Sequence, residues 1–409
     1  MNFKSETKKF IHTISGILKK LKVFETFAGI GAQNKALTNL FNDEVLVKNN
    51  GLENKHFEVV GTSEWYIDGI ISYDAIHHGK QNTFPNYKEL NKEEMLSFLK
   101  DYDLSKDSKN LYPFNSIKKL SFDRVRQIFI ALKRNKNYGS ILNIKGKELP
   151  KIDMLTYSFP CQDLSNIGKG KGIKKNNQDD CNTATRSGLL WEIERILFEL
   201  KELNKLPKFL VMENVKALIQ KNHYPDWLIF EKNVLEKLGY KNTTMVLNAL
   251  DFNIPQNRER VFVISELNGI SNINVESFCR WTTGVGKFLD WSNNKYKEEY
   301  LKTIPNNTPS RKKMWEKSKQ IFEDTIHFQT ITTKQDRHPN CGNIYFPNKE
   351  VQLKDGVEIL KSQYRFITPR ESLLLMGFTN KDYEILLDIN MSKDEIWKQT
   401  GNSIVVNVL

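Results

Sequence analysis

Residues 21–32, LKVFETFAGIGA, decide how this chain folds. An apolar strand is predicted at 21–25, a turn at Gly29 and Gly31, and a helix from the apolar periodicity of residues 32–40. Glycines let a backbone bend sharply and approach a ligand beside a helix N-terminus. The pattern predicts either a cofactor loop or an ordinary glycine turn, because the full G-x-G-x-x-G dinucleotide fingerprint is missing.

Strands and helices alternate along the chain up to residue 265. Further strands are predicted at 56–63, 152–158, 209–212, 243–247 and 260–265, and helices at 65–77, 187–203 and 230–238. Strands that alternate with helices form parallel sheets covered on both faces. The fold class is therefore predicted to be α/β, with a doubly wound, mostly parallel sheet.

The pattern changes twice, which predicts a division into domains. Residues 80–140 are a Lys- and Asn-rich insertion with helical stretches at 91–99 and 122–132. Residues 267–363 show weak periodicity and predict a smaller, irregular domain. Helical periodicity returns at 370–376, and the final GNSIVVNVL predicts a loop that opens into a helix. We predict a catalytic domain at 1–266, a second domain at 267–363, and a return segment at 364–409 that completes the first.

Composition limits the classes of function. With 409 residues, two domains are expected. The formal charge of +12 predicts a polyanionic partner, although a general bias toward lysine explains it equally well. The four cysteines include no C-x-x-C pair, which argues against a zinc site, and no metal site is predicted. The absence of a secretory signal and of 18 consecutive apolar residues predicts a cytoplasmic protein without a membrane partner.

Four groups near predicted strand ends can carry chemistry. Glu64 stands where an acid grips ribose hydroxyls in such folds, and Trp65 could stack on adenine; a surface Glu and a core Trp are the alternative. Cys161, after the rigid Pro160, is either a thiolate nucleophile or a buried structural cysteine. Glu213 follows an apolar strand, where a partly buried carboxyl group can hold or donate a proton; a helix-capping turn is the alternative.

Arg258 and Arg260 precede the apolar run 261–264, and one guanidinium group could be directed inward; a solvated charge run is the alternative. A thiolate, a carboxyl group and an arginine together suit nucleophilic addition to a pyrimidine. Addition of a thiolate at C6 of cytosine, with a carboxyl group at N3, makes C5 nucleophilic toward an electrophilic methyl group.

In their order, these motifs resemble those of the DNA cytosine-5 methyltransferase family, particularly the bacterial restriction–modification enzymes. The resemblance covers most of residues 21–265 and 364–409. The matching blocks are residues 24–32, Glu64-Trp65, Pro160-Cys161-Gln162, Glu213-Asn214-Val215, residues 256–260, 365–378 and 401–404.

The resemblance implies a Rossmann-like methyltransferase sheet and S-adenosylmethionine as cofactor. By this resemblance Cys161 adds to C6 of a flipped-out cytosine, Glu213 engages N3, and Arg260, with Arg258 as the second candidate, holds O2 or orients Glu213. The cofactor pocket would be lined by Phe27, Ala28, Gly29, Ile30, Gly31, Glu64, Trp65, Pro160 and Asn402.

The resemblance also implies a specific short duplex DNA site as substrate. The loop carrying Gln162 and Ser165 would close over the DNA, and residues 267–363 would be the target-recognition domain. DNA contacts there are expected from Lys334 and Arg337, with Lys312, Lys313 and His338 as further candidates. A monomer is expected, and a cognate restriction endonuclease acting on the same site is a further implied partner.

Three features depart from the family pattern. The acid expected on the third strand is not obvious, and the nearest candidate is Asn143-Ile144. The 80–140 insertion is longer than compact members need, and the chain stops at Leu409, where the family continues a helix. Three rival functions are an RNA cytosine-5 methyltransferase, a non-enzymatic DNA-binding scaffold, and a nicotinamide-dependent dehydrogenase.

Overall fold

The structure is a computed structural model that describes residues 20–43, 47, 56–160, 186–269, 282, 284–291, 294–335, 340–347, 351–354 and 357–409. It divides into two compact units. The first unit contains Met1–Leu247 and Glu259–Ser277, and the second contains Asn248–Arg258 and Phe278–Leu409. The predicted boundaries at residues 266 and 363, and the predicted role of 364–409 in completing the catalytic domain, stay predictions.

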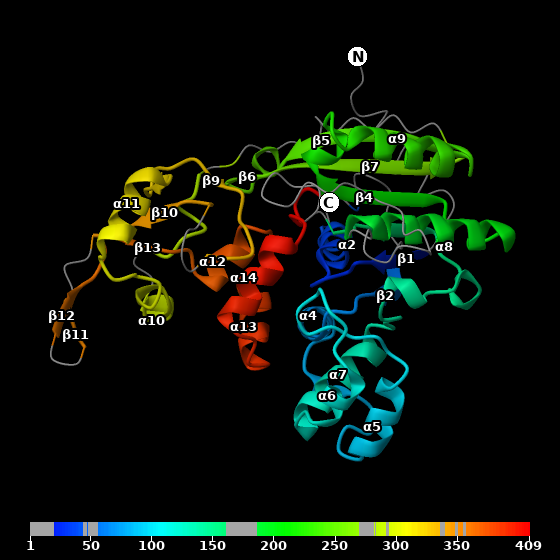
Figure 1. The fold of residues 1–409 in the computed structure, drawn as a ribbon, viewed down its shortest axis with the longest axis horizontal. Helices are drawn as coiled ribbons and strands as arrows, with labels where there is room; N and C mark the ends of the chain where they lie inside the picture. The colour runs from blue at the N-terminus through cyan, green and yellow to red at the C-terminus, as the bar shows by residue number, and fades with distance from the viewer. Residues whose placement is uncertain are drawn as a thin grey trace. The chain divides into compact units, whose positions relative to one another are not determined.

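A six-stranded sheet forms the centre of the first unit (Figure 1). Its strands are β1 (Lys20–Thr26), β2 (His56–Ser63), β3 (Met154–Tyr157), β4 (Phe209–Val215), β5 (Tyr240–Asn248) and β7 (Glu259–Leu267), in the order β2-β1-β3-β4-β7-β5. The pairs β1–β2, β1–β3 and β3–β4 are parallel, whereas β7 runs antiparallel to β4. The prediction of a mostly parallel α/β sheet is confirmed.

Alternate residues of the strands pack on opposite faces of this sheet, because successive side chains of a strand point to opposite sides. On one face, Leu155 and Leu210 belong to a buried cluster with side chains of α8 (Leu190–Glu202) and α9 (Tyr224–Phe230). On the other face, their neighbours Met154 and Phe209 pack in a cluster with Leu37 of α2 (Ala32–Asn42). Helices therefore cover both faces, as predicted.

The 80–140 insertion folds as part of the first unit. It contains η1 (Gln81–Thr83), α5 (Lys92–Leu99), α6 (Phe114–Lys118) and α7 (Phe122–Arg134), with η2 (Ile141–Asn143) and η3 (Gly146–Glu148) after it. Two of these helices match the predictions at 91–99 and 122–132. Helix α7 packs against α4 (Ile67–His78), where Arg134 Nε lies 2.9 Å from Oδ1 of the buried Asp74. The insertion is thereby fastened to the helix that follows Glu64 and Trp65.

The second unit has only short strands, as expected for a smaller, irregular domain. Its strands are β6 (Gln256–Asn257), β8 (Gln320–Ile321), β9 (Phe328–Gln329), β10 (Asn343–Tyr345), β11 (Val351–Lys354), β12 (Val357–Leu360) and β13 (Tyr364–Arg365). Its longer helices are α10 (Lys297–Leu301), α11 (Pro309–Lys317), α12 (Pro369–Leu374), α13 (Asn380–Asp388) and α14 (Lys393–Asn402). A buried apolar cluster around Phe328, Ile344 and Ile367 forms its core.

Two predicted elements differ from the structure. The helix predicted at 230–238 begins earlier, as α9 at Tyr224 with proline in its first turn, and continues as the π-helical η6 (Glu231–Glu236). The prediction that GNSIVVNVL opens into a helix is wrong, because α14 ends at Asn402. That helix begins instead after Ser392, whose side chain accepts a hydrogen bond from the backbone of Glu395.

The remaining short helical turns are η4 (Arg186–Leu189), η5 (Lys216–Ile219), η7 (Ala249–Asp251) and η9 (Asn294–Tyr296). Within the part of the chain that the structure describes, no helix combines the length and apolar character needed to cross a bilayer.

Candidate active site

The glycine loop joins β1 to α2 and has left-handed backbone angles at three positions, with φ of 54° at Phe27, 54° at Gly29 and 78° at Gly31. A Cβ added at Gly31 would lie 2.2 Å from Nε2 of His77, so the packing of α4 also requires glycine there. A Cβ added at Gly29 would meet nothing within 4 Å. Gly29 therefore faces open space, which leaves its backbone accessible to a ligand. Ala28 and Ile30, also predicted to line the cofactor pocket, are buried.

Glu64 holds this loop in place. One carboxylate oxygen, Oε2, accepts a hydrogen bond of 2.9 Å from the backbone N–H of Gly29. The other oxygen accepts from the backbone N–H groups of Trp65 and Tyr66, at 2.9 and 2.8 Å. The structure thus brings together the carboxyl ends of β1 and β2, where α/β proteins bind their ligands. Trp65 is half-buried beside them.

A buried carboxyl group that the sequence did not single out lies behind the loop. Glu25, at the end of β1, is fully buried, and the Tyr73 hydroxyl donates a 2.8 Å hydrogen bond to its Oε2. The Asn34 side-chain amide donates in turn to the Tyr73 hydroxyl at 2.8 Å. Burial raises the pKa of Glu25 to about 7, although the hydrogen bonds from the Tyr73 hydroxyl and from the backbone of Asn34 oppose the rise. The sequence signal that could have identified Glu25 is its position between an apolar strand and a glycine loop.

The insertion supplies a second acid close to this end of the sheet. Its Ser105 pairs through the backbone with the segment after Glu64, donating to Trp65 O at 2.8 Å and accepting from Ile67 N at 2.9 Å. Two residues earlier, Asp103 accepts a 2.8 Å hydrogen bond from the side-chain amide of Asn143. The resemblance predicted an acid near Asn143. In the structure Asn143 is not itself an acid but donates a hydrogen bond to one, Asp103 of the insertion.

Glu213 occupies the end of β4 and is nearly buried. The Ser158 hydroxyl donates to Glu213 Oε2 at 2.7 Å, and Arg260 Nε lies 3.4 Å from Glu213 Oε1. Arg260 is brought there by the antiparallel pairing of β4 with β7, in which it lies opposite Val215. Glu213 and Arg260, which the resemblance places together, are neighbours here, while Ser158, the last residue of the strand predicted at 152–158, was given no role.

Pro160 and Phe159 follow β3 and are described, and the side chain of Asn214 donates to Phe159 O at 3.0 Å. This bond ties the segment that leads to position 161 to the end of β4. Cys161, Gln162 and Ser165 lie outside the described residues. Their predicted roles stay predictions.

Arg258 has different surroundings from Arg260. It belongs to the second unit, is buried, and donates to three backbone carbonyls: Ile331 O at 3.0 Å, Gly401 O at 3.2 Å and Ser403 O at 2.8 Å. These bonds hold the segment on both sides of Asn402, whose own side chain is exposed. The structure gives Arg258 a structural contact with the 401–403 turn, and its predicted role at the base stays a prediction.

The predicted DNA-contact residues are only partly described. Lys334 is exposed, next to the buried Gln335, and Lys312 and Lys313 are exposed on α11. Arg337 and His338 lie outside the described residues. Exposure allows Lys334 to reach a phosphate or a base edge.

The residues of the first unit fit the adenosyl cofactor that the resemblance implies. Gly29 leaves space for close approach, and the carboxylate of Glu64 stands at the end of β2 with Trp65 beside it as an aromatic face. They supply room for close approach, carboxylate oxygens that accept hydrogen bonds and a stacking surface, which a ribose and a purine ring need.

Comparison with known proteins agrees with this reading. A family described as C-5 cytosine-specific DNA methylase matches residues 94–409. The orphan methyltransferase M.SssI of Spiroplasma monobiae is 36% identical over 406 residues, covering 96% of each chain. The type II methyltransferase M2.ScrFI of Lactococcus lactis subsp. cremoris is 35% identical over 399 residues, covering 95% of this chain and 97% of that one.

Among solved structures, the Dnmt2 methyltransferase of S. pombe has a TM-score of 0.57 at 16% identity and covers 95% of each chain. The methyltransferase EhMeth of Entamoeba histolytica has a TM-score of 0.57 at 16% identity, with 96% of each chain covered. At this identity the two likenesses show the fold alone. The sequence matches carry the assignment: the chain belongs to the C-5 cytosine-specific DNA methylase family and uses S-adenosylmethionine as its methyl donor.

Proposed function

We propose that this enzyme methylates C5 of a flipped-out cytosine in a specific short duplex DNA sequence, through a covalent bond between Cys161 and C6. The observation that supports this most is the carboxylate of Glu213, held between the Ser158 hydroxyl and Arg260 at the end of β4. Strand β3 lies beside β4, and the chain reaches Cys161 only four residues after β3 ends at Tyr157.

The proposed chemistry follows from these groups. The Cys161 thiolate adds to C6 and opens the 5,6 double bond, while the Glu213 carboxyl group donates its proton toward N3 and stabilises the added electron pair. S-adenosylmethionine, held by the loop Phe27–Gly31 with Glu64 and Trp65, would supply the electrophilic methyl group that the activated C5 accepts. A base then removes the C5 proton, the 5,6 double bond re-forms, Cys161 leaves as thiolate, and N3 returns its proton to the Glu213 carboxylate. Ser158 and Arg260 keep the Glu213 carboxyl group directed at the ring throughout.

We assign the cofactor site to the loop Phe27–Gly31, Glu64, Trp65, Pro160 and Asn402. Asp103 is added to this set in place of the missing third-strand acid. Asp103 Oδ2 accepts the hydrogen bond from Asn143, so Asp103 Oδ1 can accept one from the exocyclic amine of adenine. The insertion would thereby take part in cofactor binding.

We assign target recognition to residues 267–363, with Lys334 and Arg337 as DNA contacts, and closure over the DNA to Gln162 and Ser165. We further propose a monomeric, cytoplasmic enzyme that protects host DNA. Its relatives include one named as an orphan methyltransferase and one named as type II, so a cognate restriction endonuclease is a separate proposal.

The experiment is methyl transfer from labelled S-adenosylmethionine to unmethylated duplex DNA and, in parallel, to RNA, followed by bisulfite mapping. The proposal predicts transfer to DNA at one short sequence, and a strong loss in Glu213→Gln with cofactor affinity unchanged. Transfer to RNA alone, or methylation without sequence preference, would overturn the assigned substrate.

A further inference from the structure

The second unit contains a cavity of about 240 Å³ that none of the predicted site residues lines. Three of its lining residues are cations, Lys302, Arg311 and Lys393, and two are aromatic, Phe366 and Trp397. No carboxylate lines it. The cavity therefore combines a concentration of positive charge with apolar ring surfaces.

The cations come from three separate segments that meet at this cavity. Lys302 follows α10, Arg311 lies in the first turns of α11, and Lys393 is the first residue of α14. The Arg311 guanidinium group lies 5.9 Å from the centre of the Phe366 ring, and Lys393 Nζ lies 5.8 Å from that of Trp397. The aromatic rings thus form a floor over which two of the three charges are placed.

A buried donor at the cavity lacks a partner. Trp397 is only 3% exposed, and its Nε1 has no hydrogen-bond acceptor among the described residues. A buried indole N–H normally finds an acceptor, and the described residues supply none to Trp397 Nε1. The three cations likewise form no ion pair with a described carboxylate. An oxyanion in the cavity would accept hydrogen bonds from these donors.

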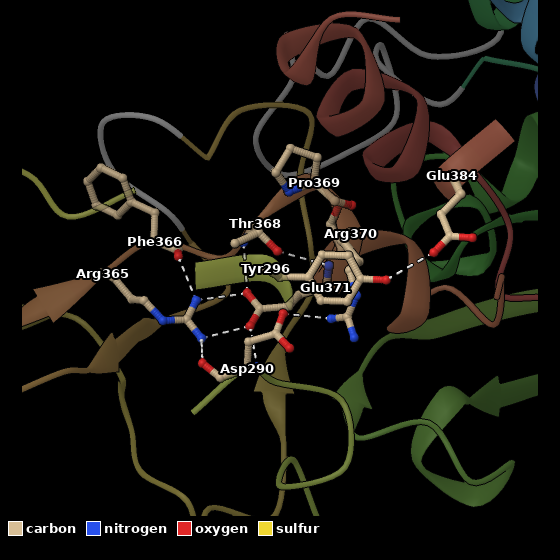
Figure 2. Close-up of polar contacts among 10 residues, drawn as sticks. Asp290, Tyr296, Arg365, Phe366, Thr368, Pro369, Arg370, Glu371 and Glu384 are labelled. Atoms are coloured by element: carbon tan, nitrogen blue, oxygen red, sulfur yellow. Dashed lines mark hydrogen bonds and ion pairs between the residues drawn. The ribbon is translucent and has the colours of Figure 1, made fainter. Parts of the chain in front are cut away.

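Two buried acids of the second unit, Glu371 and Asp290, are paired with other arginines (Figure 2). Arg365, on β13 beside Phe366, donates to both carboxylate oxygens of Glu371, at 2.7 and 2.8 Å, and both side chains are fully buried. Arg370 lies 2.7 Å from Asp290 Oδ2. These two acids therefore pair with arginines that do not line the cavity, and the Arg365–Glu371 pair joins β13, next to Phe366, to α12.

We propose that this cavity binds one phosphate group of the DNA backbone. Lys302, Arg311 and Lys393 would neutralise its charge, and Trp397 Nε1 would donate to one of its oxygens. A volume of about 240 Å³ is smaller than the roughly 300 Å³ at which pockets for whole organic ligands begin, which favours a phosphate with part of its sugar over a nucleotide. The inference rests on DNA being the substrate, and it predicts a contact that positions the duplex without reading its sequence.

The test compares the wild type with the double variant Lys302→Ala/Lys393→Ala and a control of equal charge change, Lys88→Ala/Lys381→Ala, on exposed lysines outside the cavity. The Kd for duplex oligonucleotides is measured over a series of salt concentrations. Loss of one phosphate contact should lower the slope of log Kd against log salt by about 0.9, equally for duplexes with and without the target sequence. Trp397→Phe, which keeps a ring but removes the donor, should weaken binding without changing the slope.

The control double variant should keep the wild-type slope, and the cavity variant should keep the wild-type kcat at saturating DNA and the wild-type affinity for S-adenosylmethionine. An unchanged slope in the cavity variant, or a loss confined to the target sequence, would overturn the proposal. So would a cavity that binds inorganic phosphate while DNA affinity stays the same in the variant. Because binding is measured apart from methyl transfer, a wild type that binds DNA but transfers no methyl group would refute the proposed function alone.

Discussion

Replacing Glu25 by glutamine should change how the stability of the protein depends on pH. Burial raises the pKa of the Glu25 carboxyl group from 4.5 to about 7. Between these values the folded protein keeps the proton that the unfolded chain releases, so stability falls as the pH rises. One pKa unit corresponds to about 1.4 kcal/mol, and the contribution of Glu25 to the free energy of unfolding should therefore fall by about 3 kcal/mol across this range.

Glutamine stays uncharged and still offers an oxygen to the Tyr73 hydroxyl, so the variant should lack this fall. Asp74 and His78 also have shifted pKa values, raised to about 6 and lowered to about 4, chiefly because the surrounding protein removes water from both side chains. They are present in both proteins, and the difference between the two isolates Glu25. The assay is urea unfolding from about pH 5 to about pH 8. A wild-type-minus-variant difference that does not change with pH would refute the reasoning.

Three further predictions concern the site. Ser158→Ala should lower kcat about tenfold and leave the KM for DNA nearly unchanged, because the Glu213 carboxylate loses a 2.7 Å hydrogen bond. An unaltered kcat in steady-state methyl transfer would show that Ser158 does not act at the site. Gly29→Ala should cost about 1 kcal/mol through its positive φ alone. Gly31→Ala should cost about 1–3 kcal/mol more, because the added Cβ meets a ring nitrogen at 2.2 Å, and equal losses in thermal unfolding would contradict this. Asp103→Asn should weaken the binding of S-adenosylmethionine, measured by calorimetric titration, but not the binding of its inosine analogue, which lacks the exocyclic amine. Equal weakening of both ligands would argue against a contact between Asp103 and that amine.

The central sheet could be predicted because its strands are short apolar runs bounded by turns. The run at 56–63 coincides with β2, and the strand expected at 209–212 continues three residues further along β4 to Val215. Helix α14 was missed because its sequence, KDEIWKQTGN, has only Ile396 and Trp397 as large apolar residues and so carries little periodicity. Its burial comes from tertiary packing, which a local pattern does not reveal.

The motifs located Glu64, Glu213 and Arg260, but the partners of such groups come from distant segments. Ser158 and Glu213 are 55 positions apart, Asp103 and Asn143 are 40 apart, and Glu25 and Tyr73 are 48 apart. These pairs meet only through the crossover order of the sheet and the docking of the insertion. Local sequence therefore identifies the groups that carry the chemistry, but not the distant residues that position them.

The two arginines illustrate the same limit. Arg258 and Arg260 are two positions apart before one apolar run, and two such residues on a single strand would share a face. In the structure β6 ends at Asn257 and β7 begins at Glu259, and Arg258 lies between the two strands. Its guanidinium group is bonded to backbone carbonyls of the second unit, whereas Arg260 reaches Glu213 in the first.

The central claim is that Cys161 forms a covalent bond to the target cytosine. The most direct measurement incubates the wild type and Cys161→Ala with S-adenosylmethionine and duplex DNA carrying 5-fluorocytosine, in which the C5 substituent cannot leave as a proton. The account predicts a stable protein–DNA adduct for the wild type and none for the variant, which should also lose methyl transfer on ordinary DNA while still binding the cofactor. Adduct formation or methyl transfer that survives in Cys161→Ala would contradict it.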